Sequence, residues 1–141
     1  MKKYLVVGNP INHSLSPELH NHWIKQNKLD AIYEKKKLND NELDKLISDI
    51  RKGKITGANV TVPFKNSIIP YLDKLSDEAK ITQSVNTIYI KDKKVVGHNT
   101  DIQGFENAFE KINFNFANKK IFILGAGGVV PSIIYASMKM K

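Results

Sequence analysis

The chain has 141 residues, no cysteine and a formal charge of +8, from 22 lysine and arginine residues against 14 aspartate and glutamate residues. The absence of cysteine excludes disulfides, thiolate metal sites and a cysteine nucleophile. Of the four histidines, only His20 and His22 lie close in sequence, and at that spacing they point to different faces of a helix. We therefore expect no bound metal.

The positive charge lies on scattered lysines, and Arg51 is the single arginine. Proteins that read DNA bases favour arginine for bidentate contacts, so a solvated surface is the better interpretation and nucleic-acid binding the competing one. Only four apolar residues follow Lys3, whereas a signal peptide needs about 7–15. Residues 121–138 carry no charge, but their glycines and proline favour a strand, a turn and a helix over a membrane span. We predict a cytoplasmic protein.

In the first half of the chain, short apolar runs alternate with amphipathic segments. Ser16 is a good N-cap for a helix that would place Leu19, Trp23 and Ile24 on its apolar face. The other elements predicted here are strands at Tyr4–Val7, Ala31–Glu34 and Ile55–Val62 and a helix over Asn39–Arg51, with Asn39 and Glu42 at its start and Gly53 at its end.

The second half continues the alternation. The predicted elements are a short helix from Pro63, a helix over Leu72–Ile81, a hairpin of Val85–Ile90 with Val95–His98, a helix through Phe105 and Ile112, a linker at Asn113–Asn118, a strand at Lys120–Leu124 and a helix from Val129.

Alternating strands and helices predict an α/β fold. The polar linker predicts a boundary between a domain of residues 1–115 and a segment of residues 116–141. A nucleotide-binding half-fold needs βαβαβ, whereas the second segment supplies one strand and one helix. We therefore expect the chain to be the front part of a longer protein with an incomplete Rossmann domain at its end.

Four motifs could bear chemistry, and the first lies before the helix from Ser16. The hydroxyls of Ser14 and Ser16 would stand next to free backbone N–H groups at the positive end of the helix dipole, where a carboxylate is stabilised. The alternative is that Ser16 merely caps the helix.

The second motif ends the strand at Ile55–Val62. Asn59 and Thr61 share one face of that strand near its carboxyl end, where α/β folds place ligands. Lys65 follows in the first turn of a helix, where a cation is electrostatically unfavourable. Lys65 is therefore either a surface accident or a lysine with a labile charge.

The third motif combines Asn86, which can donate to and accept from a hydroxyl, with Asp101, which could pair with a lysine and take part in proton transfer. The alternative is that Thr100 or Asp101 only starts the following helix, and both roles are compatible.

The fourth motif is the glycine turn Gly125–Gly128 between a predicted strand and a helix, the context of a dinucleotide pyrophosphate site. The third glycine of G-x-G-x-x-G is absent because position 130 is valine. The turn still allows close approach of a ligand to the backbone.

Taken together, the motifs resemble shikimate dehydrogenase over nearly the whole chain. The matching pieces, in order, are GNPINHSLSPELHN (8–21), GANVTVPFK (57–65), SVNT (84–87), HNTDIQGF (98–105) and GAGG (125–128). The resemblance implies an N-terminal substrate-binding domain with a mixed sheet, followed by a Rossmann domain. It also implies the reversible NADP-linked reduction of 3-dehydroshikimate to shikimate in the biosynthesis of chorismate and aromatic amino acids, with NAD as a less favoured cofactor.

The resemblance assigns roles residue by residue. Lys65 matches the catalytic lysine, paired with Asp101, and Ser14 and Ser16 match the serines that bind the substrate carboxylate. Asn59 joins the expected substrate site from its place in the second motif, and Thr61, Asn86 and Asp101 match contacts to the ring hydroxyls. The expected cofactor contacts are Asp77, Gly125, Ala126, Gly127, Gly128 and Val129.

The departures from the family are modest. Ser84 stands where many relatives have alanine, and Val130-Pro131 replaces a small residue and an arginine. We expect this chain alone to be inactive or nearly so. The alternatives are a quinate/shikimate dehydrogenase with broader substrate or NAD use and a non-catalytic shikimate-binding fragment. A homodimer is compatible with each of these functions.

Overall fold

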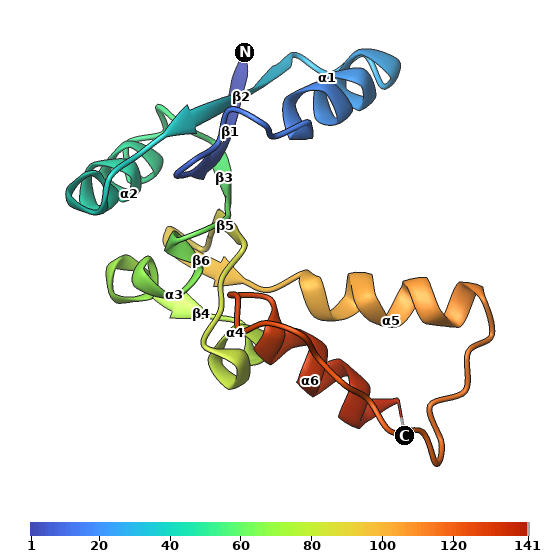
Figure 1. The fold of residues 1–141 in the computed structure, drawn as a ribbon. Helices are drawn as coiled ribbons and strands as arrows, with labels where there is room; N and C mark the ends of the chain where they lie inside the picture. The colour runs from blue at the N-terminus through green and yellow to red at the C-terminus, as the bar shows by residue number, and fades with distance from the viewer. Residues whose placement is uncertain (141) are drawn as a thin grey trace.

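A computed structural model describes residues 1–140 and contains one six-stranded mixed sheet, in the order β2-β1-β3-β5-β6-β4 (Figure 1). Strands β1, β2 and β3 are parallel, β5 is antiparallel to β3 and β6, and β4 is parallel to β6. This mixed sheet confirms the predicted α/β class. The strands are β1 (Lys2–Gly8), β2 (Ala31–Lys37), β3 (Gly57–Val60), β4 (Lys74–Leu75), β5 (Thr87–Lys91) and β6 (Lys94–His98).

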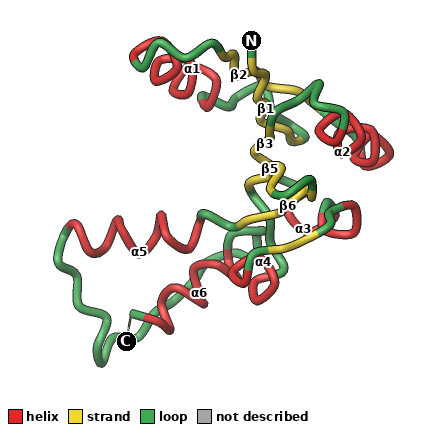
Figure 2. The backbone as a smooth tube through the Cα atoms, turned by 180° about the vertical axis from the view of Figure 1, so that it is seen from behind, coloured by secondary structure: helices red, strands yellow, loops and turns green. Residues whose placement is uncertain are grey.

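Helices flank both sides of the sheet. In Figures 1 and 2, α1 and α5 extend from one side of the curved sheet, while α2 and α3 lie on the other. Within residues 1–140, no helix is long and apolar enough to cross a membrane. The helices are α1 (Ser16–Gln26), α2 (Leu43–Arg51), α3 (Phe64–Ser67), α4 (Asp77–Thr82), α5 (Asp101–Lys111) and α6 (Val130–Lys139), with 3₁₀ turns η1 (Asp40–Glu42) and η2 (Ile69–Tyr71).

The main core lies between α2 and the sheet. The apolar positions of α2 are all buried, as their 3–4 spacing predicts. The expected capping box of Asn39 and Glu42 is present and starts η1, which leads into α2. Gly53 follows α2 with a φ of 72°, a conformation that glycine adopts without strain. The core therefore fixes the strands whose ends form the site.

Helix α1 differs from its prediction. Leu19 and Trp23, expected on its apolar face, are 49% and 46% exposed, whereas Ile24 packs against a small cluster that includes Tyr33. The prediction that Ser16 is the N-cap is also wrong. The hydroxyl of Ser14 instead accepts from the Ser16 N–H at 3.3 Å, because the helix begins at Ser16 itself.

The predicted helix over Leu72–Ile81 is wrong in its first half. Lys74–Leu75 pairs with β6 as the edge strand β4, and Ser76 then caps α4 by accepting from the Ala79 N–H at 3.2 Å. Pairing with a neighbouring strand outweighs local helix preference here. A two-residue strand has too short a pattern to be read from the sequence.

The segment between α5 and α6 also differs. The expected strand Lys120–Leu124 is not formed, and within residues 1–140 no strand lies beside it to complete a ladder. Its Phe122 and Leu124 are 86% and 100% exposed. The predicted polar linker contains one buried residue, Phe116, which packs against Phe105 and Phe109 of α5.

The strand directions bring four chain segments to one edge of the sheet. Val7 of β1 pairs with Val60 of β3, so the two strands end together. Thr87 begins β5 opposite Asn59 of β3 and next to the end of β6 at His98. The carboxyl ends of β1, β3 and β6 and the amino end of β5 therefore meet, and all but one of the predicted substrate residues follow or flank these ends.

Candidate active site

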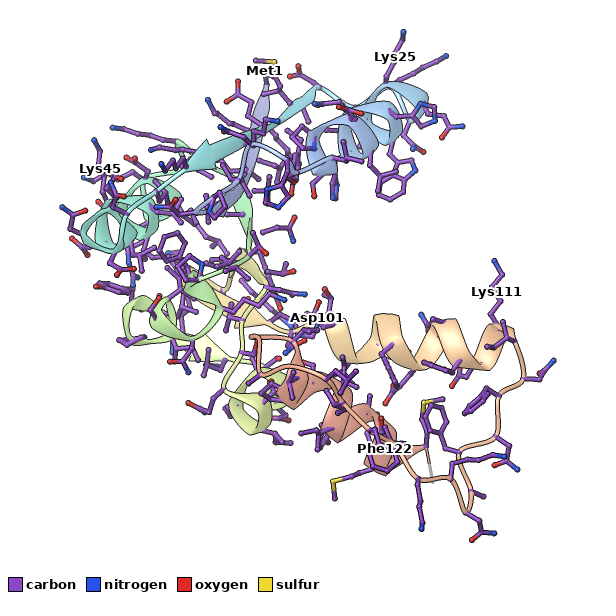
Figure 3. The ribbon with its side chains drawn as sticks, in the orientation of Figure 1. Met1, Lys25, Lys45, Asp101, Lys111 and Phe122 are labelled. Atoms are coloured by element: carbon purple, nitrogen blue, oxygen red, sulfur yellow. The ribbon has the colours of Figure 1, made fainter. Side chains whose placement is uncertain are left out.

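An ion pair of Lys65 and Asp101 lies at the centre of this edge. Lys65 Nζ is 2.7 Å from Asp101 Oδ2, and the side chains are 14% and 23% exposed. Asp101 is the first residue of α5, where the helix dipole favours an anion (Figure 3). Lys65 lies in the four-residue helix α3, and the carboxylate offsets its unfavourable position there. Lys65 is therefore a paired and mostly buried lysine rather than a freely solvated one.

Asn86 holds the second oxygen of Asp101. Its Nδ2 donates to Asp101 Oδ1 at 2.8 Å and to Thr100 Oγ1 at 2.9 Å. Its Oδ1 accepts from the Thr100 backbone N–H at 3.0 Å. Asp101 therefore both begins a helix and forms the lysine pair. Its part in proton transfer stays a prediction.

A second layer of hydrogen bonds braces Asn86 from the sheet. Tyr33 Oη donates to Asn59 Oδ1 at 2.7 Å, and Asn59 Nδ2 donates to Thr87 Oγ1 at 3.1 Å. Thr87 Oγ1 in turn donates to Asn86 Oδ1 at 2.9 Å. Burial raises the pKa of Tyr33 to about 12, so its hydroxyl remains a donor at neutral pH. In this structure Asn59 supports Asn86 and does not contact Lys65.

Sequence reasoning missed Tyr33 and Thr87. The ring of His20 stacks on Tyr33 with centroids 4.1 Å apart, and burial lowers the pKa of this histidine. No local motif marks Tyr33, because its role depends on the register that places β2 two strands away from β3. Thr87 adjoins Asn86 in sequence, and this adjacency was the one available signal.

Backbone contacts fix the lysine and the neighbouring loops. The Lys65 carbonyl accepts from the Val85 N–H at 2.8 Å, which anchors α3 beside Asn86. The loop after β1 packs on the loop after β3, because a Cβ added to Gly8 would lie 2.6 Å from Thr61 Cγ2. Thr61, a predicted substrate contact, therefore lies at the same edge as Lys65.

Ser14 lies at this edge on the loop that leads from β1 into α1, and Ser16 is the first residue of α1. Both are partly buried. The Ser14 hydroxyl is already used at the start of the helix, and the hydrogen bonds within residues 1–140 do not connect either serine with Lys65 or Asp101. Their convergence with the ion pair around one ligand remains a prediction.

The glycine turn borders a cavity of about 410 Å³ that reaches Lys65. Gly125 has a φ of 118°, a conformation that few other residues adopt, and Gly127 has open space where a Cβ would be. Helix α6 begins at Val130, directly after the turn. Backbone N–H groups at a helix start and a turn free of side chains fit an anionic pyrophosphate.

Of the expected cofactor contacts, Ala126, Gly127 and Gly128 line this cavity, whereas Gly125, Val129 and Asp77 do not. Asp77 is exposed at the start of α4, with Oδ1 3.2 Å from Lys80 Nζ. Within residues 1–140, no group of three histidine, aspartate or glutamate side chains is placed to hold a metal ion.

Comparison with known proteins identifies the family. Residues 6–88 match the family model described as the shikimate dehydrogenase substrate binding domain, which covers more than half of the chain. The chain belongs to the shikimate dehydrogenase family.

Within this family, the chain is 60% identical over 140 residues to the shikimate dehydrogenase (NADP(+)) of Pelagibacter ubique, covering 99% of this chain and 53% of that protein. A shikimate 5-dehydrogenase from Thermus thermophilus, in complex with NADP(H) and shikimate, matches with TM-score 0.89 and 29% identity, over 99% of this chain and 52% of that one. The Listeria monocytogenes enzyme, in complex with shikimate and NAD, matches with TM-score 0.90 and 34% identity, over 99% and 48%. The chain thus spans about half the length of the relatives it matches.

Proposed function

We propose that this chain supplies the substrate-binding half of an NADP-linked shikimate dehydrogenase, which reversibly reduces 3-dehydroshikimate to shikimate. The observation that carries the proposal is the Lys65–Asp101 pair, 2.7 Å apart and held by Asn86 at the sheet edge, in a chain of this family. A lysine beside a carboxylate is suited to moving the proton of an alcohol.

We place proton transfer on Lys65. In the oxidation direction, its uncharged amine accepts the proton of the ring hydroxyl, provided that the oxygen lies within hydrogen-bond reach. Asp101 stabilises the ammonium that forms, across the 2.7 Å contact. In the reduction direction, the charged Lys65 steadies the developing alkoxide and returns the proton. NADP, when bound, supplies or receives the hydride.

The remaining predicted residues orient the ligands in this proposal. Ser14 and Ser16, at the start of α1, would hold the substrate carboxylate, while Thr61 and Asn86 would contact ring hydroxyls. The residues that would hold the cofactor pyrophosphate are Gly125, Ala126, Gly127, Gly128 and Val129. The cavity that reaches Lys65 supports this for Ala126, Gly127 and Gly128, which line it. The assignment of Asp77 to the cofactor rests only on the family resemblance.

A chimera tests the proposal. Residues 1–141 are joined to the C-terminal half of the Pelagibacter ubique relative, and NADP reduction by shikimate is measured for the chimera and for the 141-residue chain. We expect turnover by the chimera and little or none by the short chain, since one helix and an unpaired segment cannot enclose a dinucleotide. Calorimetric titration of the short chain with shikimate then measures the substrate site separately. A chimera that binds shikimate without turnover would favour the non-catalytic alternative.

The second candidate is a quinate/shikimate dehydrogenase with broader substrate or NAD use. The Listeria monocytogenes complex with NAD favours only the NAD use, because that protein has the same fold over this chain at 34% identity. The ratio of kcat/KM for shikimate over quinate distinguishes the substrate range of the chimera. Its cofactor preference reports on the relative's nucleotide domain, so only the substrate comparison tests residues of this chain.

A further inference from the structure

A cluster of buried polar side chains lies behind the Lys65–Asp101 pair, apart from the residues assigned to either ligand. Its members come from three separate segments of the chain and are between 0% and 4% exposed. They are Thr82, Ser84, Asn99 and Ser132.

Asn99 connects these segments. Its Nδ2 lies 2.8 Å from Ser132 Oγ, 3.0 Å from Thr82 Oγ1 and 3.0 Å from the Ser84 carbonyl oxygen. Its Oδ1 accepts from the Asp101 backbone N–H at 2.9 Å. The amide thus uses its donor side on the cluster and its acceptor side on the first residue of α5. A rotation of Asn99 would break both sets of bonds together.

The cluster also reaches the glycine turn. Ser132 lies in the first turn of α6, and Ser84 Oγ donates to the Gly128 carbonyl at 2.9 Å. The aliphatic stem of Lys65 lies against Gly128, since a Cβ built there would be 3.5 Å from Lys65 Cδ. The glycine turn that borders the predicted pyrophosphate site therefore contacts Lys65 directly. It is connected to Asp101 indirectly, through Ser84 and Asn99.

Burial makes this connection stiff. Inside a protein, each polar group that loses its partner is left unpaired away from water, which is strongly unfavourable. A shift of α6 would leave the buried hydroxyl of Ser132 without Asn99, and a shift of Asp101 would leave Asn99 Oδ1 without the Asp101 N–H. The position of α6 is therefore coupled to that of the Asp101 backbone, which carries the carboxylate.

We propose that Asn99 is a positioning residue that couples the glycine turn and α6 to the Lys65–Asp101 pair, so that a dinucleotide held at the turn orders the proton-transfer group. The inference rests on the proposed function for its catalytic meaning, but the coupling itself is a property of residues 1–140. It assigns no ligand contact to Asn99.

Hydrogen exchange in the 141-residue chain tests the coupling without any cofactor. Ser132→Ala removes one partner of Asn99 and leaves Asp101 untouched. Ser137→Ala is the matched control, because Ser137 is a buried serine of the same helix whose hydroxyl has no hydrogen-bond partner within the described residues. The rate measured is that of the Asp101 amide relative to the amides of Val7 and Val60 in the sheet.

We expect Ser132→Ala to speed exchange of the Asp101 amide about fivefold, within the range of one net hydrogen bond, and Ser137→Ala to change it less than twofold. Asn99→Ala should speed it by more than either. Equal rates in the two serine variants would overturn the coupling. Acceleration by Asn99→Ala alone would also overturn it, because Asn99 would then be only a helix cap. The serine pair decides the outcome if Asn99→Ala does not fold.

Kinetics of the chimera tests the positioning role. We expect Ser132→Ala to raise the KM for NADP and lower kcat, each about threefold, while the KM for shikimate stays within twofold. A merely structural loss would reduce the amount of active enzyme and leave both KM values unchanged, and that result would overturn the role. If the unsubstituted chimera has no turnover, the proposed function fails, while the exchange experiment still decides the coupling.

Discussion

Residues 1–112 and residues 113–140 both contain apolar runs that predict strands, but these strands form only in the first region. In the first region, each apolar strand finds a neighbour, and the strand ends carry the polar groups of the candidate site. In the second, Lys120–Leu124 is as apolar as Tyr4–Val7, yet it forms no strand and leaves Leu124 fully exposed. A strand thus needs a second segment beside it, because its hydrogen bonds join the backbones of two neighbouring segments.

The same contrast holds for the two candidate ligand sites. The Lys65–Asp101 pair is fixed from several sides by Asn86, Asn99 and the backbone of Val85. The glycine turn has fewer supports, which are the Ser84 hydroxyl, the stem of Lys65 and α6. We therefore expect substrate binding to depend on the first region alone and cofactor binding to need more chain than these residues provide.

The largest effect expected is on the core of the first region. Ile50 of α2 is fully buried against the sheet, so Ile50→Ala should lower the free energy of unfolding by about 2–5 kcal/mol, from lost burial and the cavity left behind. Urea denaturation followed by circular dichroism measures this change. A loss below about 1 kcal/mol would mean that α2 does not anchor the sheet as the structure shows.

The next effect is on catalysis at the junction of the two regions. Lys65→Ala in the chimera should lower kcat about 100-fold or more, because the proton acceptor is lost, with little change in the KM for shikimate. Lys54→Ala is a matched control, since Lys54 also pairs with an aspartate, Asp49 of α2, but is exposed and belongs to neither candidate site. An unchanged kcat in Lys65→Ala would remove the lysine from the mechanism.

Much of the first region could be predicted from the sequence. The spacing of α2, its capping box and the start of α5 are local patterns, and the family motifs brought together Lys65, Asn86 and Asp101. The supports of these residues could not be predicted, because Tyr33 reaches Asn59 and Asn99 reaches Ser132 across the fold. Such contacts depend on strand order and packing, which no local pattern encodes.

The predictions for the apolar face of α1 and for the strand at Lys120–Leu124 were wrong for a related reason. Leu19 and Trp23 have helical spacing, but spacing alone does not say which face meets the sheet. Apolar sequence likewise made Lys120–Leu124 a strand candidate while leaving its partner unspecified. Both predictions assumed that an apolar segment has a surface to pack against, which the apolar sequence by itself does not show.

A smaller effect concerns pH at the support layer. The folded chain holds the pKa of Tyr33 at about 12, above the ordinary value near 10, because burial disfavours the phenolate. Between pH 10 and 12 the unfolded chain releases this proton while the folded chain keeps it, so stability present below pH 10 is lost as pH rises. Stability of the wild type and of Tyr33→Phe, measured by urea denaturation at pH 9, 10 and 11, checks this.

Tyr33→Phe should lower stability at pH 9 by about 1 kcal/mol, through loss of the bond to Asn59, and should show a shallower decline above pH 10. Tyr89→Phe, on the partly exposed strand β5, controls for the loss of any tyrosine hydroxyl. Equal declines in all three proteins would show that Tyr33 does not titrate late.

The smallest effect expected in the 141-residue chain itself bears most directly on the comparison of the two regions. Leu124→Ser should change the stability of the 141-residue chain by less than about 0.5 kcal/mol, because a fully exposed side chain has no burial to lose. In the chimera, which supplies further nucleotide-domain chain, the same change should lower stability by about 2 kcal/mol or more if Leu124 becomes buried beside a neighbouring strand. Lys119→Ser, in the exposed loop before this segment, should have little effect in either protein. A large loss in the short chain would show that the segment already packs there, whereas a small loss in both would show that supplying neighbours is not enough to bury it.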